Sequence, residues 1–321
     1  MGIRLAGARE AVAATHDGSA RWTCALVNNM PDAAFCATER QFVGLLAAGS
    51  GNETVAITRY AMTGVPRGER IQARIAAEYH PLDDIFSNPP DLLVVTGSNP
   101  IESRIEDEPY WSDLHGLLKW SSENVQAMVV SCLSAHAALA VFDGVERTTL
   151  PAKCTGVFAQ HADPTHPLVA GLYGSVVLPH SRLNAVPKET VVRAGYSVAL
   201  HSEEVGWSVV TKTVGQAEVV LVQAHPEYDP SSLVREYARD VRRYAGREQD
   251  ELPRLPLDCV TGPDWDRLRR LHRRILSGER DPALVAAFPF DEVCHRAPWP
   301  WRGAAQRLYA NLLGTIPKRS V

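Results

Sequence analysis

One cysteine lies where an apolar strand is expected to run into a helix. The apolar segment 128–131 leads directly to Cys132, and residues 134–142 have the composition of a helix. A nucleophile on such a sharp turn presents its side chain at the end of a sheet. The N-terminus of the helix also favours the thiolate form, through its positive dipole and unpaired N–H groups. Cys132 is therefore a candidate nucleophile. The alternative is a small buried apolar residue, which most lone cysteines are.

A candidate base follows a second apolar segment. His225 comes at the end of the run 219–224, and Glu227 stands two residues later. On an extended backbone these two residues point to the same side, and Pro226 keeps His225 extended. Glu227 can then fix the tautomer of His225 and stabilise its imidazolium, as the third member of a catalytic triad does. The alternative is a solvated histidine at the end of a strand.

The elements expected around these residues form an α/β fold with a mostly parallel central sheet and helices on both faces. Strand-like and helix-like segments alternate through the first 145 residues, which predicts right-handed βαβ units. In such sheets, sites gather at the carboxyl ends of the strands, where Cys132 and His225 both lie. The expected strands are 22–27, 55–60, 91–96 and 127–131, and the expected helices begin at 38, 110 and 134.

The second half predicts a more antiparallel arrangement and one decoration. Short strand-like runs cover 175–178, 197–200, 206–210 and 217–224, and helices are expected over 230–245 and 299–313. Residues 63–90 are expected to be a loop with one short helix. We predict a flexible N-terminal arm over 1–20 and a single α/β domain over 21–321, with a charged insertion at 246–290 that is rich in Arg, Asp and Pro.

The composition excludes several classes of protein. The chain has 321 residues, 45% of them hydrophobic, and a net charge of −4, which is unlike a nucleic-acid binder. No apolar run reaches membrane-spanning length, and the N-terminus lacks the pattern of a signal peptide. Six scattered cysteines without a CxxC pair indicate reduced thiols, and neither a disulfide framework nor a metal site. A cytoplasmic enzyme with no nucleic-acid or membrane partner is expected.

A cysteine elbow followed by His-Pro-Glu is similar to class I glutamine-amidotransferase-like folds. More narrowly, the chain resembles the homoserine O-acyltransferases of methionine biosynthesis, which are the O-succinyltransferases and O-acetyltransferases, over roughly residues 22–245 and the last helix. The matching motifs are Asn28-x-Met30-Pro31, Thr38-Glu39-x-Gln41, Val95-Thr96-Gly97, Tyr110-Trp111, Trp120-Ser121, Cys132 with Ala137-Ala138-Leu139, Lys153-x-x-Gly156-Val157, Pro179-His180-Ser181-Arg182, His225-Pro226-Glu227-Tyr228-Asp229, Glu236-x-x-Arg239-Asp240 and Trp301-Arg302.

This resemblance implies a two-step acyl transfer with acyl-CoA as co-substrate and no resident cofactor. Cys132 would take the acyl group, and the hydroxyl of homoserine would then attack the thioester. His225 would be the base and Glu227 would orient it. The N–H of Leu133 would stabilise the oxyanion, with a second donor from the loop at Gly97 and Ser98.

The amino-acid substrate is a zwitterion, so its pocket needs one anion and one cation. Glu236 and Arg239 lie at i and i+3 of a predicted helix and fit that need, although an ordinary surface ion pair is the alternative. Lys153 and Ser181 match family positions that face the substrate pocket. Arg182 matches another, with a structural role as the alternative.

The chain departs from the family pattern at several positions, one of which bears on the donor. Where members carry a small or an acidic residue, associated with succinyl and acetyl donors respectively, this chain has Ile101, whose bulk slightly favours acetyl; the donor is left open. Leu133 and His136 replace the usual Trp and Gln, and His136 is expected to be a packing residue.

Other readings of the chain remain open at this point. A hydrolase or amidase could use the same triad but would not require Glu236 and Arg239, and a non-catalytic relative could bind ligands only. The basic run 267–274 is expected to be solvated or to face another subunit in a homodimer, with contact to the phosphates of CoA as the alternative.

Overall fold

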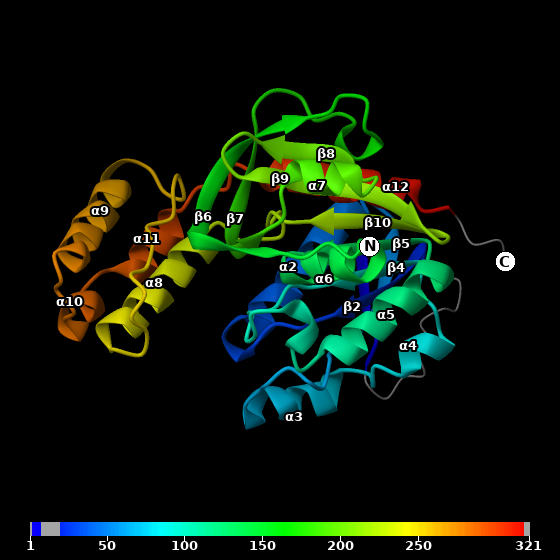
Figure 1. Cartoon of the computed structure of the whole chain (residues 1–321), viewed down its shortest axis with the longest axis horizontal. Helices are drawn as coiled ribbons and strands as arrows, with labels where there is room; N and C mark the ends of the chain where they lie inside the picture. The colour runs from blue at the N-terminus through cyan, green and yellow to red at the C-terminus, as the bar shows by residue number, and fades with distance from the viewer. Residues whose placement is uncertain (1, 8–19, 318–321) are drawn as a thin grey trace.

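A computed structural model describes residues 2–7 and 20–317, which form a ten-stranded sheet with helices on both faces (Figure 1). The strand order is β1-β3-β2-β4-β5-β10-β9-β8-β6-β7. The α/β class and the mostly parallel central sheet are confirmed. The strands are β1 (Gly2–Leu5), β2 (Trp22–Val27), β3 (Thr54–Tyr60), β4 (Leu92–Val95), β5 (Ala127–Ser131), β6 (Thr148–Ala162), β7 (Val176–Ala185), β8 (Ser197–Ser202), β9 (Gly206–Val214) and β10 (Ala217–Val222).

The strands from β1 to β10 in that order are all parallel, and the central ones are buried on both faces. Alternate residues of each strand therefore enter two separate cores. Leu26 of β2 packs with Phe42 of α2 (Asp32–Gly49) and Leu312 of α12 (Arg302–Thr315). On the opposite face Val27 packs with Leu117 of α5 (Trp111–Asn124) and with residues of α6 (Leu133–Asp143).

Strand β10 joins the two halves of the sheet. It is parallel to β5 on one side and antiparallel to β9 on the other. Beyond it, β9, β8, β6 and β7 are antiparallel, as the second half of the sequence predicted. The 15-residue strand β6 was not predicted. Pro151, Lys153 and its polar neighbours interrupt the apolar pattern by which the other strands were found.

Two helices occupy the segment 63–90, where one was expected. They are α3 (Glu69–Glu78) and α4 (Asp84–Ser87). A further helix, α7 (Lys188–Arg193), follows β7.

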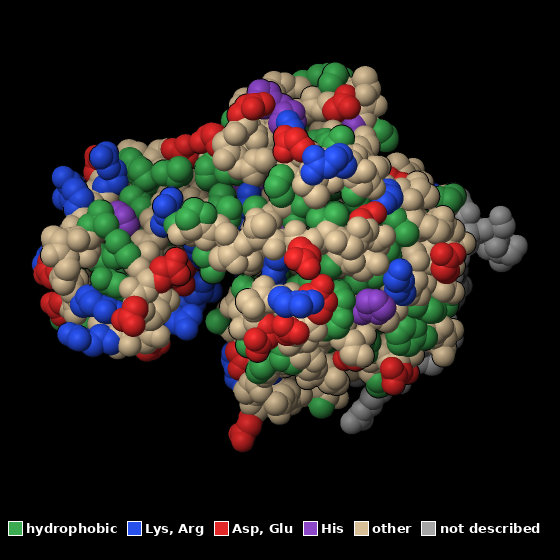
Figure 2. Space-filling view, in the orientation of Figure 1, with side chains coloured by type: hydrophobic (Ala, Val, Ile, Leu, Met, Phe, Trp, Pro, Cys, Tyr) green, Lys and Arg blue, Asp and Glu red, His purple; other side chains and the backbone are tan. Residues whose placement is uncertain are grey.

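The segment predicted as a charged insertion belongs to a helical lobe at one end of the molecule (Figure 1). The lobe consists of α8 (Ser232–Ala245), α9 (Gly262–Leu276), α10 (Pro282–Ala286) and α11 (Phe290–Arg296). Lys and Arg side chains gather on its outer surface, and a hollow separates its lower part from the body (Figure 2). The basic run 267–274 belongs to α9, where Leu268, Leu271 and Ile275 form a buried stripe and the arginines lie on the exposed side of the helix.

The prediction of an arm over residues 1–20 was wrong in part. Residues 2–5 are the edge strand β1, which pairs in parallel with β3, and Ala6 donates its N–H to the carbonyl of Ile57 at 2.9 Å. The part of this prediction that concerns 8–19 lies outside the described residues. Within the described residues, no helix combines the length and apolarity needed to cross a membrane.

Candidate active site

Cys132 lies on the turn between β5 and α6, and the sheet register brings it to the end of β10. Ser131 pairs with Val222, and the N–H of Cys132 donates to the carbonyl of Val222 at 2.7 Å. The backbone of Cys132 has φ 51° and ψ −115°, a conformation that a non-glycine residue rarely adopts. Such a conformation costs about 1 to 3 kcal/mol and is typical of a nucleophile held on a tight turn.

The neighbouring strand β4 ends at Val95, and Gly97, which has no side chain, follows it beside this turn. A Cβ on Gly97 would stand 3.0 Å from Cβ of Cys132 and 3.7 Å from the nitrogen of Leu133. Leu133 is the first residue of α6, so its N–H has no acceptor within the helix. The Leu133 N–H and Gly97 therefore lie beside Cys132, where an oxyanion formed by attack of its sulfur would need donors.

His225 and Glu227 form the predicted pair, but through a turn. Nδ1 of His225 lies 2.7 Å from Oε1 of Glu227, and both side chains are buried. The backbone does not stay extended from His225 to Glu227 as predicted, because Tyr228 donates its N–H to the carbonyl of His225 at 3.1 Å and closes a turn around Pro226. Proline suits the second position of such a turn. The N–H of His225 in turn donates to the carbonyl of Pro179 on β7 at 2.8 Å.

The electrostatics of His225 favour its protonated form. Burial opposes the imidazolium, but the Glu227 carboxylate and the sulfur of Cys132 outweigh it and hold the pKa of His225 well above its ordinary value. Nε2 of His225 is buried, and the group that acts on it among the described residues is the neighbouring sulfur of Cys132. A proton on this nitrogen is therefore available to the neighbouring sulfur or to a bound substrate.

Tyr228 links this triad to a second cluster of polar side chains and was not singled out from the sequence. Its ring stacks on His225 with centroids 4.3 Å apart, and its hydroxyl donates to Glu236. The indole N–H of Trp301 donates to the Tyr228 carbonyl at 2.9 Å. An aromatic residue directly after His-Pro-Glu was the available signal.

The second cluster joins α8 to the β6–β7 pair. Nζ of Lys153 lies 3.2 Å from Oε2 of Glu236 and 3.0 Å from Oδ2 of Asp240, and Ser181 donates its hydroxyl to Glu236. Burial raises the pKa of Glu236, but Lys153 and the hydroxyls of Ser181 and Tyr228 outweigh it and lower this pKa to about 2. Glu236 is therefore an anion at neutral pH, although only 20% of its side chain is exposed.

Arg239 and Glu236 form no ion pair with each other, although both interpretations of the sequence had allowed one. Its guanidinium binds Asp240, with Nη2 2.8 Å from Oδ1, and 36% of its side chain is exposed. Asp240 was missed as a site residue, although it is the last residue of the motif that contains Glu236 and Arg239. Two carboxylates and two cations thus form one balanced network, and the exposed part of Arg239 can accept another anion.

The sequence is similar to one known family along nearly its whole length. It matches the family described as homoserine O-succinyltransferase over residues 5–318. The chain belongs to this family. The homoserine O-succinyltransferase of Rhodopseudomonas palustris is 39% identical over 264 residues, which are 82% of this chain and 79% of that protein. That of Methylorubrum extorquens is 37% identical over 92% of this chain and 87% of its own length.

A solved structure supports the fold of this homoserine O-succinyltransferase family member. A glutamine amidotransferase from Methylobacillus flagellatus superimposes with a TM-score of 0.52 at 14% identity, over 94% of this chain and 98% of its own. The family and the amidotransferase-like fold predicted from the motifs are both confirmed.

Three residues that the resemblance to the family had singled out either lie apart from the two clusters or have structural partners. Ile101 is 53% exposed in the loop after β4, so its bulk does not fill a buried pocket. Arg182 donates to the carbonyls of Asn184 and Val205, at 2.8 and 2.5 Å, in the structural role left open above. His136 is buried and lies 3.0 Å from Oε1 of Gln223, and burial lowers its pKa to about 4, so it stays neutral.

The loop that carries Ile101 is bound by a buried ion pair that was not predicted from the sequence. Glu108 accepts the N–H groups of Ile101 and Glu102, and its Oε1 lies 3.6 Å from Nη2 of Arg147. That nitrogen also donates to the carbonyl of Glu102 at 2.8 Å. In the described part of the chain, no group of three or more His, Cys, Asp or Glu residues is arranged to hold a metal ion.

Proposed function

We propose that this chain transfers the succinyl group of succinyl-CoA to the hydroxyl of homoserine through a thioester on Cys132, in methionine biosynthesis. The observation that carries the proposal is the position of Cys132 and the His225–Glu227 pair beside a charge-balanced cluster of side chains that suits an amino acid. The family and the names of its relatives favour succinyl as the donor.

In the first half-reaction, the thiolate of Cys132 attacks the carbonyl carbon of succinyl-CoA. The oxyanion is stabilised by the Leu133 N–H and the backbone after Gly97. The carbon–sulfur bond to CoA then breaks, and the imidazolium of His225 gives its Nε2 proton to the departing CoA thiolate. The products are the Cys132 thioester, CoA and a neutral His225.

Acylation itself prepares His225 for the second half-reaction. The sulfur of Cys132 no longer carries negative charge, so one of the two groups that raise the pKa of His225 is lost. The neutral imidazole takes the hydroxyl proton of homoserine while the oxygen attacks the thioester. The carbon–sulfur bond to Cys132 breaks, and the thiolate–imidazolium pair returns.

The second cluster places homoserine for this attack. Its ammonium group complements Glu236 and Asp240, and its carboxylate complements Arg239 and Lys153. Because the network already contains two charges of each sign, a zwitterion leaves it balanced. Hydrolysis by the same triad would require no such network, which favours the transferase over a hydrolase.

Mass spectrometry of the intact protein tests the proposal. Mixed with succinyl-CoA, the wild type should gain one succinyl group, and homoserine should discharge it. Cys132→Ala should gain nothing, whereas Cys36→Ala, which changes an exposed thiol outside the site, should behave like the wild type. A protein that gains no acyl group, or a gain that survives in Cys132→Ala, would contradict the proposed mechanism.

We further propose a cytoplasmic location and a homodimer. All six cysteines are free, in keeping with a reducing compartment. Light scattering on the purified chain would test the homodimer, and a monomeric mass would contradict it.

A further inference from the structure

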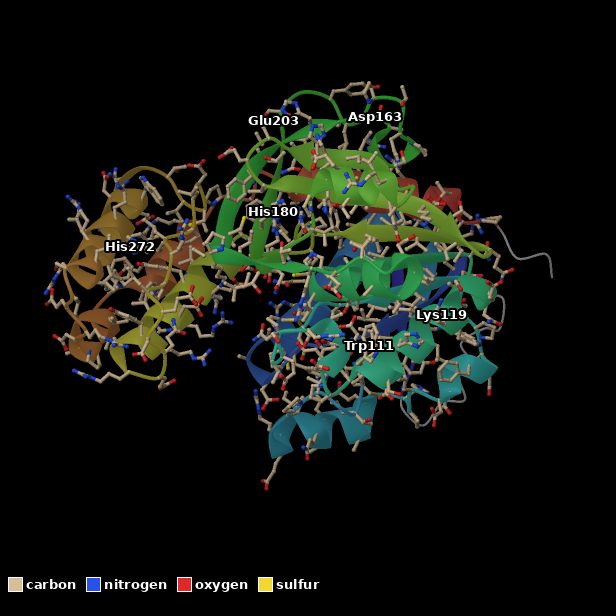
Figure 3. All side chains as sticks on the ribbon, in the orientation of Figure 1. Trp111, Lys119, Asp163, His180, Glu203 and His272 are labelled. Atoms are coloured by element: carbon tan, nitrogen blue, oxygen red, sulfur yellow. The ribbon has the colours of Figure 1, made fainter. Side chains whose placement is uncertain are left out.

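A large groove lies between the β6–β7 pair and the helical lobe. Its volume is about 870 Å³, and β6, β7, the start of α7, the segment 252–257 and one side of α9 line it. His272, labelled on the lobe in Figure 3, reaches it from α9. Four basic side chains face it, and the acidic residue in its described lining is Glu204. The basic residues are Lys153, Arg182, Lys188 and Arg254.

The register of β6 and β7 connects this groove to the site. Thr155 pairs with Ser181, which binds Glu236, and one residue further Cys154 pairs with Arg182 in the groove. At the other end Thr148 pairs with Ala185, and β7 leads into Lys188. The groove therefore runs along the two strands, away from Ser181 and toward Lys188.

Two of the four basic residues are free to bind an added anion. Lys153 is bound by Glu236 and Asp240, and Arg182 donates to backbone carbonyls. Lys188 and Arg254 form no ion pair within residues 2–7 and 20–317, and Arg254 is exposed. Between these charges the lining is largely apolar, with Leu150, Pro151, Leu252, Leu255 and Leu276 among its residues.

We propose that this groove binds the CoA part of the acyl donor. The neutral pantetheine arm lies along β6 and β7 with its thioester toward Ser181 and Cys132, and the nucleotide phosphates lie near Lys188 and Arg254. The volume is in the usual range of about 300 to 1,000 Å³ for a small-molecule site. This inference rests on the proposed function and adds the location of its larger substrate.

The inference also limits which residues near the basic run 267–274 can contact CoA. From α9, only His272 and Leu276 contribute to the described lining of the groove. Arg270 lies two residues before His272 and so points to the opposite side of the helix. It is exposed and carries the same charge as Arg254, which makes it a matched control.

The test compares Lys188→Ser/Arg254→Ser with Arg270→Ser, using two donors. One donor is succinyl-CoA, and the other is the succinyl thioester of N-acetylcysteamine, which lacks the nucleotide. We expect the double variant to raise the KM for succinyl-CoA about tenfold or more, since it loses charged contacts, and to leave kcat/KM for the short thioester unchanged. Arg270→Ser should change neither value.

Calorimetry with free CoA measures the same contacts without catalysis. The wild type should bind CoA less tightly as salt increases, and the double variant should bind it about tenfold more weakly at low salt. A double variant with unchanged affinity for CoA, or one in which both donors lose kcat/KM equally, would overturn the groove as the CoA site. A wild type that binds CoA here but forms no thioester on Cys132 would instead refute the proposed function and leave the groove standing.

Discussion

At the scale of single residues, the proposed mechanism makes the rate of the first half-reaction depend on the charge of His225 and therefore on pH. The imidazolium is the required form, and its raised pKa keeps it protonated well above the ordinary range of histidine. The His225–Glu227 pair also stabilises the fold. Its contribution to the free energy of unfolding is complete below about pH 6.5, the pKa of a histidine in the unfolded chain. It is lost as pH rises through the raised pKa of His225 in the folded protein.

Glu227→Gln should remove most of this effect. Without the carboxylate the pKa of His225 falls, so the alkaline limb of kcat/KM for succinyl-CoA should move to lower pH. The loss in kcat should be about 10² to 10⁴, as expected when the orienting member of a triad no longer fixes the tautomer. Rate profiles between pH 5 and 10 would check both effects, and an unmoved alkaline limb would contradict the assignment of Glu227.

Gly97 is the second residue whose identity the site requires. Ala at this position places a methyl group 3.0 Å from Cβ of Cys132, so the nucleophile or the oxyanion donors must shift. We expect Gly97→Ala to lower kcat about 10- to 10³-fold with little loss of stability, within the range found when an oxyanion donor is lost. Gly44→Ala is the control, because a Cβ there meets nothing within 4 Å. Wild-type kcat in Gly97→Ala would argue against this role.

At the scale of elements, the segment 252–257 is fixed to β6 by one glycine. Gly156 has φ 149°, and a Cβ on it would stand 2.8 Å from Leu257. Leu257 donates its N–H to the Thr155 carbonyl at 3.1 Å and accepts the N–H of Val157 at 2.8 Å. This contact forms one wall of the groove.

Gly156→Ala should move that wall. We expect a loss of about 1 to 3 kcal/mol in the free energy of unfolding and a larger rise in the KM for succinyl-CoA than in that for homoserine. Gly174→Ala has a comparable backbone cost, with φ 79°, but meets nothing within 4 Å. Urea titration and kinetics on both variants would separate the effect of backbone strain at the glycine from the effect of moving the segment 252–257. Equal effects on both substrates would show that the wall is not specific to the donor.

The sequence predicted the elements that carry the triad because long apolar runs identify buried parallel strands. It did not predict β6, whose Pro151 and Lys153 break such a run although the strand supplies a residue of the proposed substrate site. The i, i+3 spacing of Glu236 and Arg239 correctly placed both on α8. It could not show that Lys153 and Ser181 would arrive from another part of the chain and leave Asp240 to pair with Arg239.

At the scale of the whole molecule, the last helix supports the triad from the far end of the sequence. Trp301 precedes α12, is buried, and donates to the backbone of Tyr228, whose ring stacks on His225. α12 itself packs on α2 against the parallel half of the sheet. The position of the base is thus coupled to the docking of the C-terminal helix.

Trp301→Phe keeps most of the packing and removes this hydrogen bond. We expect a loss of about 1 kcal/mol in the free energy of unfolding and a kcat reduced about three- to tenfold, with KM for both substrates nearly unchanged. Trp299→Phe, at a partly exposed neighbouring tryptophan, is the control. If the two variants gave the same kcat, Trp301 would have no specific role in holding Tyr228.

The single ring nitrogen of His225 that does not bind Glu227 has a further consequence for product inhibition. The departing CoA sulfur and the attacking homoserine oxygen must exchange a proton with the same Nε2, so each must occupy the same place beside the thioester in turn. We therefore expect free CoA to inhibit competitively with respect to homoserine. In a cell, a rise in the ratio of CoA to succinyl-CoA would then slow the reaction by reversing the first half-reaction, without a separate regulatory site.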